Sequence, residues 1–398
     1  MTRLLVSLTE FLDDPFGSLA RARAAGGLAD FGLALGIVTY DDVRTLLTDS
    51  TRLHADFASF LRSLGITSGA FYDWMAISPL NKDGAEHLRW RALMSRTFTP
   101  RRVEQLRPFL ARAAHELIDG FVGRGECEFV TEFADAYPSL GLCELIGVPT
   151  ADRDRFRGWA NTIGLGFSPV ELALRIGEVD AALTALVDYT GELAERRRKD
   201  PRDDLVIRVA QAAHEDGWST DEVRGFIAGL VFAGHETTKN QLGWMVAVLA
   251  DRPDVWDAVA AGAEGVADVV EEVLRIRSTV TSVGRTVVEP MEHRGERIDP
   301  GTRLLLSLWG ADHDAAAYPD PERLDVAAHR DAPHVAFGHG PHHCLGAALA
   351  RAELQEGLVA LASRITCPTV GAGAAWKPNV GITGPTRLPI TFSARAPA

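Results

Sequence analysis

The stretch from Ser219 to about Ala250 places the strongest constraint on how this 398-residue chain can fold. Ser219 and Glu222 have the capping-box spacing that begins a helix, and Pro253 predicts that the helix has ended before it. At about 1.5 Å per residue, such a helix would be roughly 45 Å long. Its residues are apolar nearly all round, which is typical of a helix buried in a large core. The stretch therefore predicts a mainly α-helical domain arranged around one central helix.

The middle of this predicted helix departs from the apolar pattern at residues 233–238, which read Ala-Gly-His-Glu-Thr-Thr. In a helix Gly234 costs about 1 kcal/mol relative to alanine, and a buried Glu236 costs more unless it is paired. Thr237 can hydrogen-bond a carbonyl of the preceding turn and bend the helix. Such local conflicts are expected at functional sites. The alternative is a glycine that permits close helix packing beside an acid that reaches solvent.

A second constraint is the segment 336–346, which reads Ala-Phe-Gly-His-Gly-Pro-His-His-Cys-Leu-Gly and is followed by apolar residues at helical spacing up to Ser363. The pattern predicts that Cys344 opens a helix, where unpaired N–H groups favour a thiolate. The glycines of the segment let the backbone approach something flat and bulky, or adopt positive φ. A thiolate held this way suits haem iron, because its electron density favours O–O cleavage. An inert buried cysteine and a fragment of a zinc site are the alternatives.

The same segment fits the spacing F-x-x-G-x-H-x-C-x-G, filled by Phe337, Gly340, His342, Cys344 and Gly346. This spacing resembles the haem-binding signature of the cytochrome P450 monooxygenases. The run at 233–238 resembles the A/G-G-x-D/E-T-T oxygen-binding motif of the same family. With two further motifs in order, the resemblance covers nearly the whole chain.

The two further motifs are pairs of charged or polar residues. His87 and Arg91 are four apart, so they share one helix face, and they resemble the family's H-x-x-x-R motif; a solvated face is the alternative. Glu272 and Arg275 are three apart and match E-x-x-R, a buried ion pair behind the haem, although a surface pair has the same spacing. The resemblance adds Arg330 as the third member of that cluster.

The resemblance implies that haem b (iron protoporphyrin IX) is the cofactor and that Cys344 is the proximal ligand of its iron. It implies that Glu236 and Thr237 deliver protons during oxygen activation, which consumes them. Propionate contacts are expected from His87, Arg91, Arg285, His334 and His342. Other haem contacts are expected from Ala233, Gly234, Phe337, Gly338 and Gly346.

Electron supply is expected from a separate protein, because no flavin- or iron–sulfur-binding segment is evident in the sequence. The resemblance implies electrons from NAD(P)H through a reductase and a ferredoxin or flavodoxin. Four arginines add local positive charge to an acidic protein and form a candidate docking patch for an acidic donor: Arg89, Arg96, Arg101 and Arg102. Ordinary surface charge is the alternative.

The expected fold is the cytochrome P450 fold, mainly α, as a single domain over residues 1–398. Its small β-rich lobe should comprise roughly residues 28–60, 283–310 and 370–395. The local patterns predict a hairpin at 28–40, a short helix at 41–48, a long loop at 50–83, helices over 101–148 and 151–215, a helix at 266–277, and strands at 283–287 and 302–308. A break at 164–169 is, by resemblance, the lid over the substrate entrance. At Asp312-His313 the sequence departs from the family's usual Asn-Arg.

The expected activity is insertion of one oxygen atom from O2 into a small organic, natural-product-like substrate. The candidate pocket residues are Phe71, Trp74, Gly229, Val283 and Ile382; for the aromatic ones, packing beneath a loop is the alternative. A peroxide-driven peroxygenase and a catalytically silent recruitment or gas-binding module remain as rival functions. The Glu236-Thr237 pair disfavours the first, and the intact oxygen motif disfavours the second.

Composition restricts the partners and the compartment. The net charge of −13 does not favour binding to nucleic acid or to an acidic membrane. Four cysteines in so long a chain do not make a disulfide framework, so we expect a cytoplasmic protein. The apolar run at the N-terminus is too short for a signal peptide or a membrane anchor. We expect a monomer.

Overall fold

Helices account for most of the computed structural model, which describes residues 3–199, 204–262, 265–328 and 331–395. The α-helices are α1 (Leu8–Asp13), α2 (Pro15–Ala24), α3 (Tyr40–Leu47), α4 (Phe57–Ser63), α5 (Ala70–Ile77), α6 (Gly84–Thr97), α7 (Pro100–Asp119), α8 (Ala136–Ile146), α9 (Arg153–Gly164), α10 (Pro169–Lys199), α11 (Leu205–Glu215), α12 (Thr220–Leu249), α13 (Pro253–Ala260), α14 (Val266–Ile276), α15 (Leu308–Asp312) and α16 (Ala347–Arg364). Shorter turns of 3-10 or π type are η1 (Pro79–Asn81), η2 (Val122–Arg124), η3 (Val130–Ala134), η4 (Thr150–Asp152), η5 (Leu165–Phe167) and η6 (Gly340–His342).

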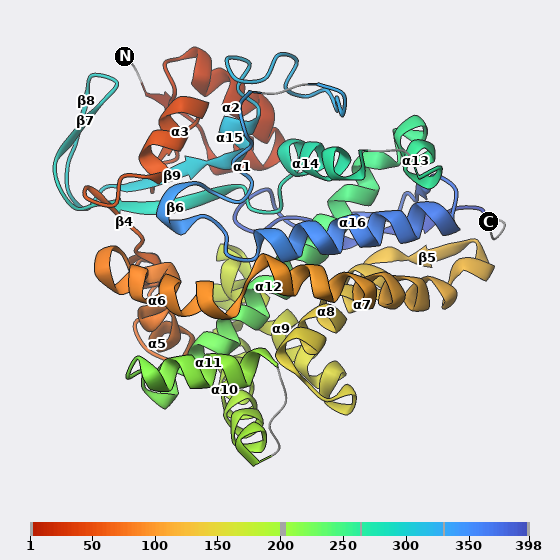
Figure 1. Ribbon diagram of the computed structural model, residues 1–398. Coiled ribbons are helices and arrows are strands. Elements are labelled where there is room, and N and C mark those ends of the chain that lie inside the picture. Colours follow the sequence, from red (N-terminus) through yellow and green to blue (C-terminus); the bar gives the residue numbers. More distant parts are fainter. Residues whose placement is uncertain (1–2, 200–203, 263–264, 329–330, 396–398) are drawn as a thin grey trace.

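The strands are short and gather mainly at one side of the molecule (Figure 1). They are β1 (Leu4–Leu5), β2 (Leu28–Asp30), β3 (Leu35–Ile37), β4 (Leu53–His54), β5 (Glu126–Glu128), β6 (Ser282–Val287), β7 (Met291–His293), β8 (Glu296–Ile298), β9 (Arg303–Ser307), β10 (Thr369–Val370), β11 (Ala375–Trp376), β12 (Pro385–Arg387) and β13 (Pro389–Thr391). Six of them form a sheet in the order β1-β2-β3-β9-β6-β4, in which β2 and β3 are the predicted hairpin.

The central helix α12 confirms the first sequence prediction. Its N-cap is Ser219, and the full capping box with Glu222 is present. Seventeen of its side chains or glycines are buried along its length, which explains why the sequence is apolar nearly all round. In Figure 1 it passes behind α7 and α16, which lie side by side across the front of the molecule. The main core surrounds it, so residues in its middle sit deep in the protein.

The segment 50–83 differs from the prediction of a long loop. It folds into β4, α4, α5 and η1, which are each too short to show a sustained period in the sequence. Asp56 caps α4 by accepting a hydrogen bond from the Ser59 N–H, and the Ser78 hydroxyl caps η1. Local capping therefore orders a stretch that periodicity alone leaves unassigned.

The C-terminal strands do not join the six-stranded sheet. β13 pairs with β10 and, on its other side, with β5 from the middle of the chain. β11 and β12 form a separate pair. Of the expected β-rich lobe, the strands near 28–60 and the strands β6 and β9 lie in the large sheet. β7 and β8 form a separate pair, and the strands of 370–395 lie in the smaller sheets.

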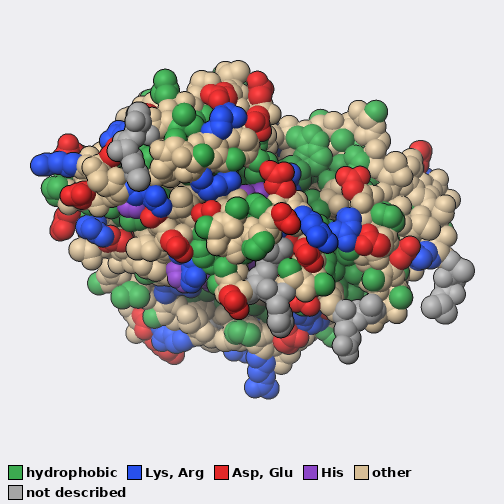
Figure 2. Space-filling model, turned by 90° about the horizontal axis from the view of Figure 1, so that it is seen from above, with side chains coloured by type: hydrophobic (Ala, Val, Ile, Leu, Met, Phe, Trp, Pro, Cys, Tyr) green, Lys and Arg blue, Asp and Glu red, His purple; other side chains and the backbone are tan. Residues whose placement is uncertain are grey.

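None of the helices in the described ranges is long and apolar enough to cross a bilayer. The face seen in Figure 2 carries Lys and Arg side chains beside Asp and Glu side chains, so charges of both signs are mixed on it.

Candidate active site

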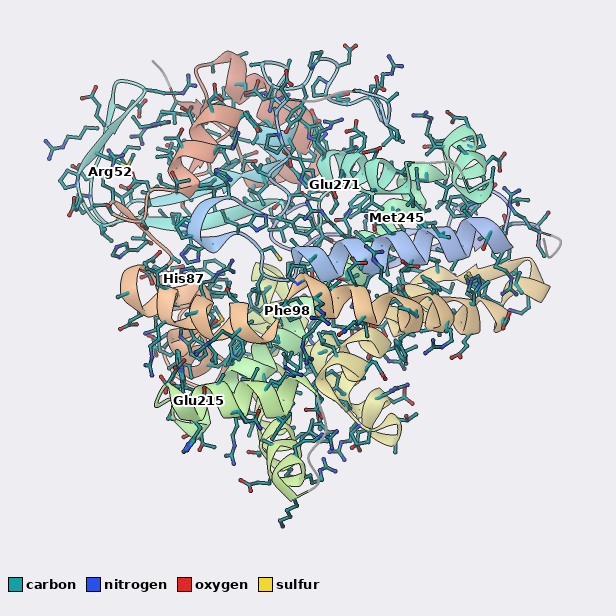
Figure 3. The ribbon with its side chains drawn as sticks, viewed as in Figure 1. Arg52, His87, Phe98, Glu215, Met245 and Glu271 are labelled. Atoms are coloured by element: carbon teal, nitrogen blue, oxygen red, sulfur yellow. The ribbon has the colours of Figure 1, made fainter. Side chains whose placement is uncertain are left out.

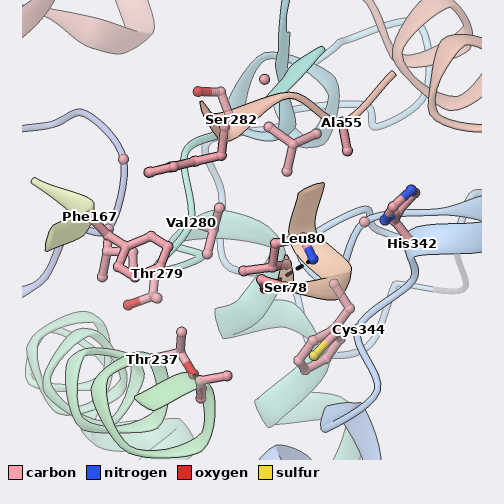
Figure 4. A pocket seen from close by; sticks show the side chains of 18 of the residues that line it. Ala55, Ser78, Leu80, Phe167, Thr237, Thr279, Val280, Ser282, His342 and Cys344 are labelled. Atoms are coloured by element: carbon pink, nitrogen blue, oxygen red, sulfur yellow. Dashed lines mark hydrogen bonds between the residues drawn. The ribbon is translucent and has the colours of Figure 1, made fainter. Parts of the chain in front are cut away.

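A cavity of about 1160 Å³ lies between the middle of α12, the sheet and the segment that precedes α16. Thr237 on α12 and Cys344 lie on opposite sides of it (Figure 4). The cavity is therefore where the two strongest motifs of the sequence meet.

The segment around Cys344 is held by its own backbone. The Cys344 N–H donates to the Phe337 carbonyl at 2.8 Å, and the Gly338 N–H donates to that of Val335 at 2.7 Å. Gly340 has a φ of +72°, and a Cβ there would lie 2.9 Å from the Leu47 carbonyl oxygen. Only glycine fits this position without strain, so the motif glycine seats the segment against α3.

Cys344 differs in one respect from the sequence prediction, because α16 begins at Ala347 and the cysteine precedes it. Its side chain is reachable from the cavity. Burial among protein atoms raises the pKa of its thiol, while the N–H of Gly346 and the charge of Arg91 act in the opposite direction. The N–H groups of Gly346 and Ala347, at the N-terminus of α16, thus still favour a thiolate although Cys344 itself precedes the helix.

The cavity wall beside Cys344 carries a set of basic and imidazole side chains. His87 points from α6 toward the segment that precedes α16 (Figure 3), and its ring stacks on that of His342 at 4.0 Å. Burial and the neighbouring charges lower the pKa of His87 to about 4, so it is neutral at pH 7. The Arg91 guanidinium donates to the His343 carbonyl at 3.0 Å. His342 Nε2 lies 2.9 Å from Asp83 Oδ1.

Arg285 completes this set from β6. It is buried, and its hydrogen bond within the described residues goes to the neighbouring Gly284 carbonyl at 2.8 Å, from one of its five N–H donors. Burial lowers its pKa, and the charge of Asp83 opposes that effect. A buried guanidinium with spare donors in the same cavity as an accessible cysteine sulfur fits an anionic cofactor with a metal centre. The donor set of Cys344, Arg91, Arg285 and the two histidines is therefore compatible with haem and its propionates.

His334 is not part of this set, which corrects the sequence prediction. Its Nε2 lies 3.0 Å from Glu271 Oε2, and its Nδ1 accepts the Ala336 N–H at 3.2 Å. Glu271, which lies over the start of α16 in Figure 3, also accepts two bonds from Arg351 at 2.6 and 2.8 Å. Both nitrogens of His334 are thus occupied outside the cavity, where they help to fix the segment leading to Phe337.

Glu272 and Arg275 form the predicted buried ion pair. All five N–H donors of Arg275 are used: two bonds of 2.8 and 2.9 Å go to Glu272, and three go to the carbonyls of Asp312, Pro321 and Arg323. The pair therefore ties α14 to the chain beyond α15. The predicted third member, Arg330, lies outside the described residues.

Asp312 and His313, where the sequence departs from the family pattern, are both buried. Asp312 Oδ1 accepts the Val335 N–H at 2.8 Å, so α15 is tied directly to the residues that lead into the cysteine segment. Burial raises the pKa of Asp312 to about 7. Burial lowers the pKa of His313 to about 3, and its Nδ1 donates to the Trp309 carbonyl at 3.1 Å.

Thr237 presents its hydroxyl to the cavity. The hydroxyl donates to the Ala233 carbonyl, one turn earlier, at 2.6 Å. Because its proton is engaged there, its lone pairs can accept a hydrogen bond from a group in the cavity. Ala233 and Gly234 line the same wall, as predicted, and a Cβ on Gly234 would lie 2.8 Å from Leu142 Cδ2.

Glu236 differs most from its predicted role. It is fully buried, and the described wall of the cavity includes its neighbours Gly234 and Thr237 but not Glu236. Its carboxylate is ion-paired with Lys239 at 2.6 Å and with Lys377 from the C-terminal segment. Burial alone would raise its pKa, but the two lysines lower it to about 2. An ionised carboxylate outside the cavity does not agree with direct proton delivery by Glu236.

Four of the five predicted pocket residues lie on the cavity wall. Trp74, Gly229, Val283 and Ile382 line the cavity. Trp74 donates its indole N–H to the Gly225 carbonyl at 2.8 Å, which fixes its ring against α12. Phe71 does not line the cavity: it is completely buried beside Gly166, where a Cβ would come within 2.5 Å of its ring.

Some residues that line the cavity gave no clear signal in the sequence. Phe167 from η5 stacks on Phe232 of α12 at 4.2 Å, and both line the cavity. Glu353 on α16 also lines it, is fully buried, and has a pKa well above its usual value because of burial. In the sequence, only its position one turn after Leu349, within an apolar stripe, indicates that the Glu353 side chain is buried.

The four arginines of the candidate docking patch divide into two pairs. Arg89 packs over the Trp218 ring at 3.8 Å and donates to the Asp216 carbonyl at 3.1 Å. Arg96 forms an ion pair with the Asp216 carboxylate. Arg101 and Arg102 lie at the start of α7. Part of the positive charge of the patch is therefore matched within the chain.

The zinc alternative for His342-His343-Cys344 finds no support. Within the described ranges, no group of three His, Cys, Asp or Glu side chains could hold a metal ion.

Known proteins are similar to this chain along nearly its whole length. The family model of cytochrome P450 matches residues 178–366. The luteothin monooxygenase of Streptomyces thioluteus is 33% identical over 390 residues, which cover 97% of this chain and 96% of that protein. The mycinamicin IV hydroxylase/epoxidase of Micromonospora griseorubida is 35% identical over 366 residues, 89% of each chain. The structure of cytochrome P450 CYP109Q5 from Chondromyces apiculatus has a TM-score of 0.88 and 28% identity, covering 98% of this chain and 99% of that one.

Proposed function

The chain belongs to the cytochrome P450 family and is a monooxygenase of it, and we propose that its substrate is a small natural product and that its electrons come from NAD(P)H through a separate reductase and a ferredoxin or flavodoxin. The family implies a haem cofactor, which supplies the activation of dioxygen when bound. The other steps depend on residues of this chain.

The observation that carries the proposal is the cavity between Thr237 and Cys344. Its volume of about 1160 Å³ exceeds the roughly 300–1,000 Å³ of ordinary ligand pockets, which leaves space for a cofactor and an organic substrate. Phe167, Phe232 and Trp74 give its wall an apolar character. The names of two relatives refer to luteothin and to mycinamicin IV, and they support a natural product as the substrate.

We assign Thr237 the role of a hydrogen-bond acceptor in the cavity. A protonated group in the cavity can donate a hydrogen bond to the hydroxyl oxygen of Thr237. This hydrogen bond holds the proton of that group in a fixed position. Glu236 then has a positioning role. By pairing with Lys377 it holds the middle of α12 against the segment that continues to Ile382 on the cavity wall.

The docking of an electron donor is assigned to the start of α7. Arg101 and Arg102 lie there, and Arg89 and Arg96, which contact Trp218 and Asp216, add to the positive charge nearby. An acidic ferredoxin would be attracted to this end, and the attraction would weaken as salt is raised.

A reconstitution tests the proposal. The haem-loaded protein is assayed with a candidate natural product under three electron sources: NAD(P)H with a reductase and ferredoxin, the same with flavodoxin, and hydrogen peroxide alone. We expect product to require dioxygen and NAD(P)H, and reduction to slow at raised salt. Product with peroxide alone would favour a peroxygenase. A normal thiolate-haem spectrum with no turnover across a broad substrate set would favour a silent module.

A further inference from the structure

Arg303 is a cation on the cavity wall whose guanidinium finds no polar partner in the part of the chain that the structure describes. It makes neither a hydrogen bond nor an ion pair among the described residues, and it packs against the ring of Phe60 on α4, whose centroid lies 4.4 Å from the Arg303 Cζ. By contrast, Arg275 uses all five of its donors. The contact with Phe60 holds the Arg303 head group in place but leaves its N–H groups unfilled.

The sheet makes room for this head group. Arg303 is opposite Thr286 in the pairing of β9 with β6, and Gly284 is two residues away on the same face. A Cβ on Gly284 would lie 3.3 Å from Arg303 Nη2, so the guanidinium lies over the glycine. Thr286, Gly284 and Arg303 all line the cavity. The position is therefore a shaped recess in the cavity wall.

The environment of Arg303 favours a counter-ion. Its pKa is lowered by burial, and the charge of Asp56 acts the other way. Asp56 is itself engaged, because its carboxylate accepts from the Ser59 N–H at 2.9 Å and faces Arg62 at 3.8 Å. A planar guanidinium with free donors matches a carboxylate, to which it can make two parallel hydrogen bonds. Because the recess offers one guanidinium and Asp56 lies nearby, a singly charged carboxylate is favoured over a doubly charged phosphate.

The recess is remote from the reacting end of the cavity. In Figure 4 the chain from Thr279 through Val280 to Ser282 leads away from Thr237 and Cys344. Thr286, opposite Arg303, is four residues beyond Ser282 on β6, which adds about 13 Å along the strand. A group bound at Arg303 would therefore belong to the end of a substrate far from the carbon that is oxidised.

We propose that Arg303, seated over Phe60 and Gly284, binds a carboxylate carried by the substrate at the end remote from the site of oxidation. The inference rests on the proposed monooxygenase function and narrows its substrate class to acidic molecules. The anchor would fix how far the substrate reaches toward Thr237, and so which carbon is oxidised.

Binding of paired probes tests the inference. The haem-loaded ferric protein is titrated with straight-chain carboxylic acids of increasing length and with their methyl esters, and binding is followed by calorimetry and by the spin-state change. Charge-assisted hydrogen bonds contribute about 1.5–3 kcal/mol, so we expect the best acid to bind about ten- to hundred-fold more tightly than its ester. In Arg303→Gln this preference should vanish, and in Arg303→Lys it should be reduced. Arg297→Gln changes an exposed arginine on β8 and is the matched control; this variant should keep the preference for the acid over its ester.

The outcomes separate this inference from the function itself. Equal binding of acid and ester by the unaltered protein would overturn it, as would a preference that persists in Arg303→Gln or the failure of every acid to bind. The carbon monoxide spectrum of each variant reports whether haem and fold are intact. NAD(P)H-dependent oxidation of a neutral substrate, in the unaltered protein and in Arg303→Gln, tests the monooxygenase function without involving the anchor.

Discussion

The ion-paired Glu236 gives the sharpest quantitative test of the structure. In Glu236→Gln the carboxylate is lost while Lys239 and Lys377 stay largely buried, so two cations lose their common partner. At the 2.6 Å between Lys239 Nζ and Glu236 Oε2, an effective dielectric constant of about 20 gives roughly 6 kcal/mol of Coulomb attraction. The net contribution of the pair is smaller, because burying the charges costs desolvation free energy. Removing one partner of such a buried cluster destabilises a protein by about 3–5 kcal/mol.

This free energy converts into a measurable change in Tm. Unfolding entropy is about 2.1 cal/mol/K per residue, so 398 residues give roughly 0.8 kcal/mol/K. Glu236→Gln should therefore lower Tm by about 4–6 °C, followed by circular dichroism of the haem-loaded protein at a fixed scan rate. Glu178→Gln, which removes an exposed carboxylate paired with Arg175, is the matched control and should leave Tm unchanged. An equal Tm for Glu236→Gln and the unaltered protein would refute the buried cluster.

A double variant and the pH dependence test the cause. If unpaired Lys377 produces the loss, Lys377→Met should recover part of it in the Glu236→Gln background, by about 1–3 kcal/mol; strict additivity would contradict the pairing. The pKa of Glu236 is lowered in the folded state from 4.5 to about 2. Its contribution is therefore complete above pH 4.5 and is lost as the pH falls toward 2, so the difference in Tm should shrink over that interval.

Three further predictions concern the site. Cys344→Ser removes the thiolate, so the reduced carbon monoxide complex should lose its strongly red-shifted band; survival of the band would exclude Cys344 as the ligand. Thr237→Ala removes the acceptor hydroxyl but keeps the helix, so NAD(P)H oxidation should continue while product falls and hydrogen peroxide rises; the test needs a substrate without a hydroxyl near the oxidised carbon, and unchanged coupling would remove Thr237 from the mechanism. Arg275→Lys leaves three N–H donors for the five hydrogen bonds that Arg275 makes to Glu272 and to three backbone carbonyls, so Tm should fall by about 3–6 °C. A change below about 1 °C would show that the planar guanidinium geometry is unimportant at this position.

The sequence was sufficient to predict elements that have a regular pattern over many consecutive residues. The capping box of Ser219 and the apolar run behind it fixed α12, and the pairs at His87 and Glu272 each lay on the helix face that their spacing predicted. The prediction of a long loop at 50–83 was wrong because the helices there are shorter than the window in which a helical period can be recognised. Caps on Asp56 and Ser78 were the only local signals there.

The environment of a side chain was harder to predict than its place on an element. Nothing in the sequence around Lys377 shows that it reaches Glu236, because the two are 141 positions apart and meet only through the tertiary fold. His334 lies close to the cysteine motif, yet Glu271 from α14 determines its contacts. Likewise the recess at Arg303 depends on Gly284 of a neighbouring strand and on Phe60 of α4. Contacts of this kind are set by packing between distant segments.

The small sheet that joins β5 to β13 has a consequence for synthesis on the ribosome. Cys127 in β5 is paired with Ile390 in β13, 390 − 127 = 263 positions later. At about 5–20 residues per second, β5 emerges roughly 13–50 s before its partner exists. During that time its N–H and C=O groups form an open edge that a neighbouring nascent chain could pair with. We therefore expect chains truncated before residue 385 to aggregate through this segment, and expression at lowered temperature, which disfavours such association, to raise the yield of the full-length protein.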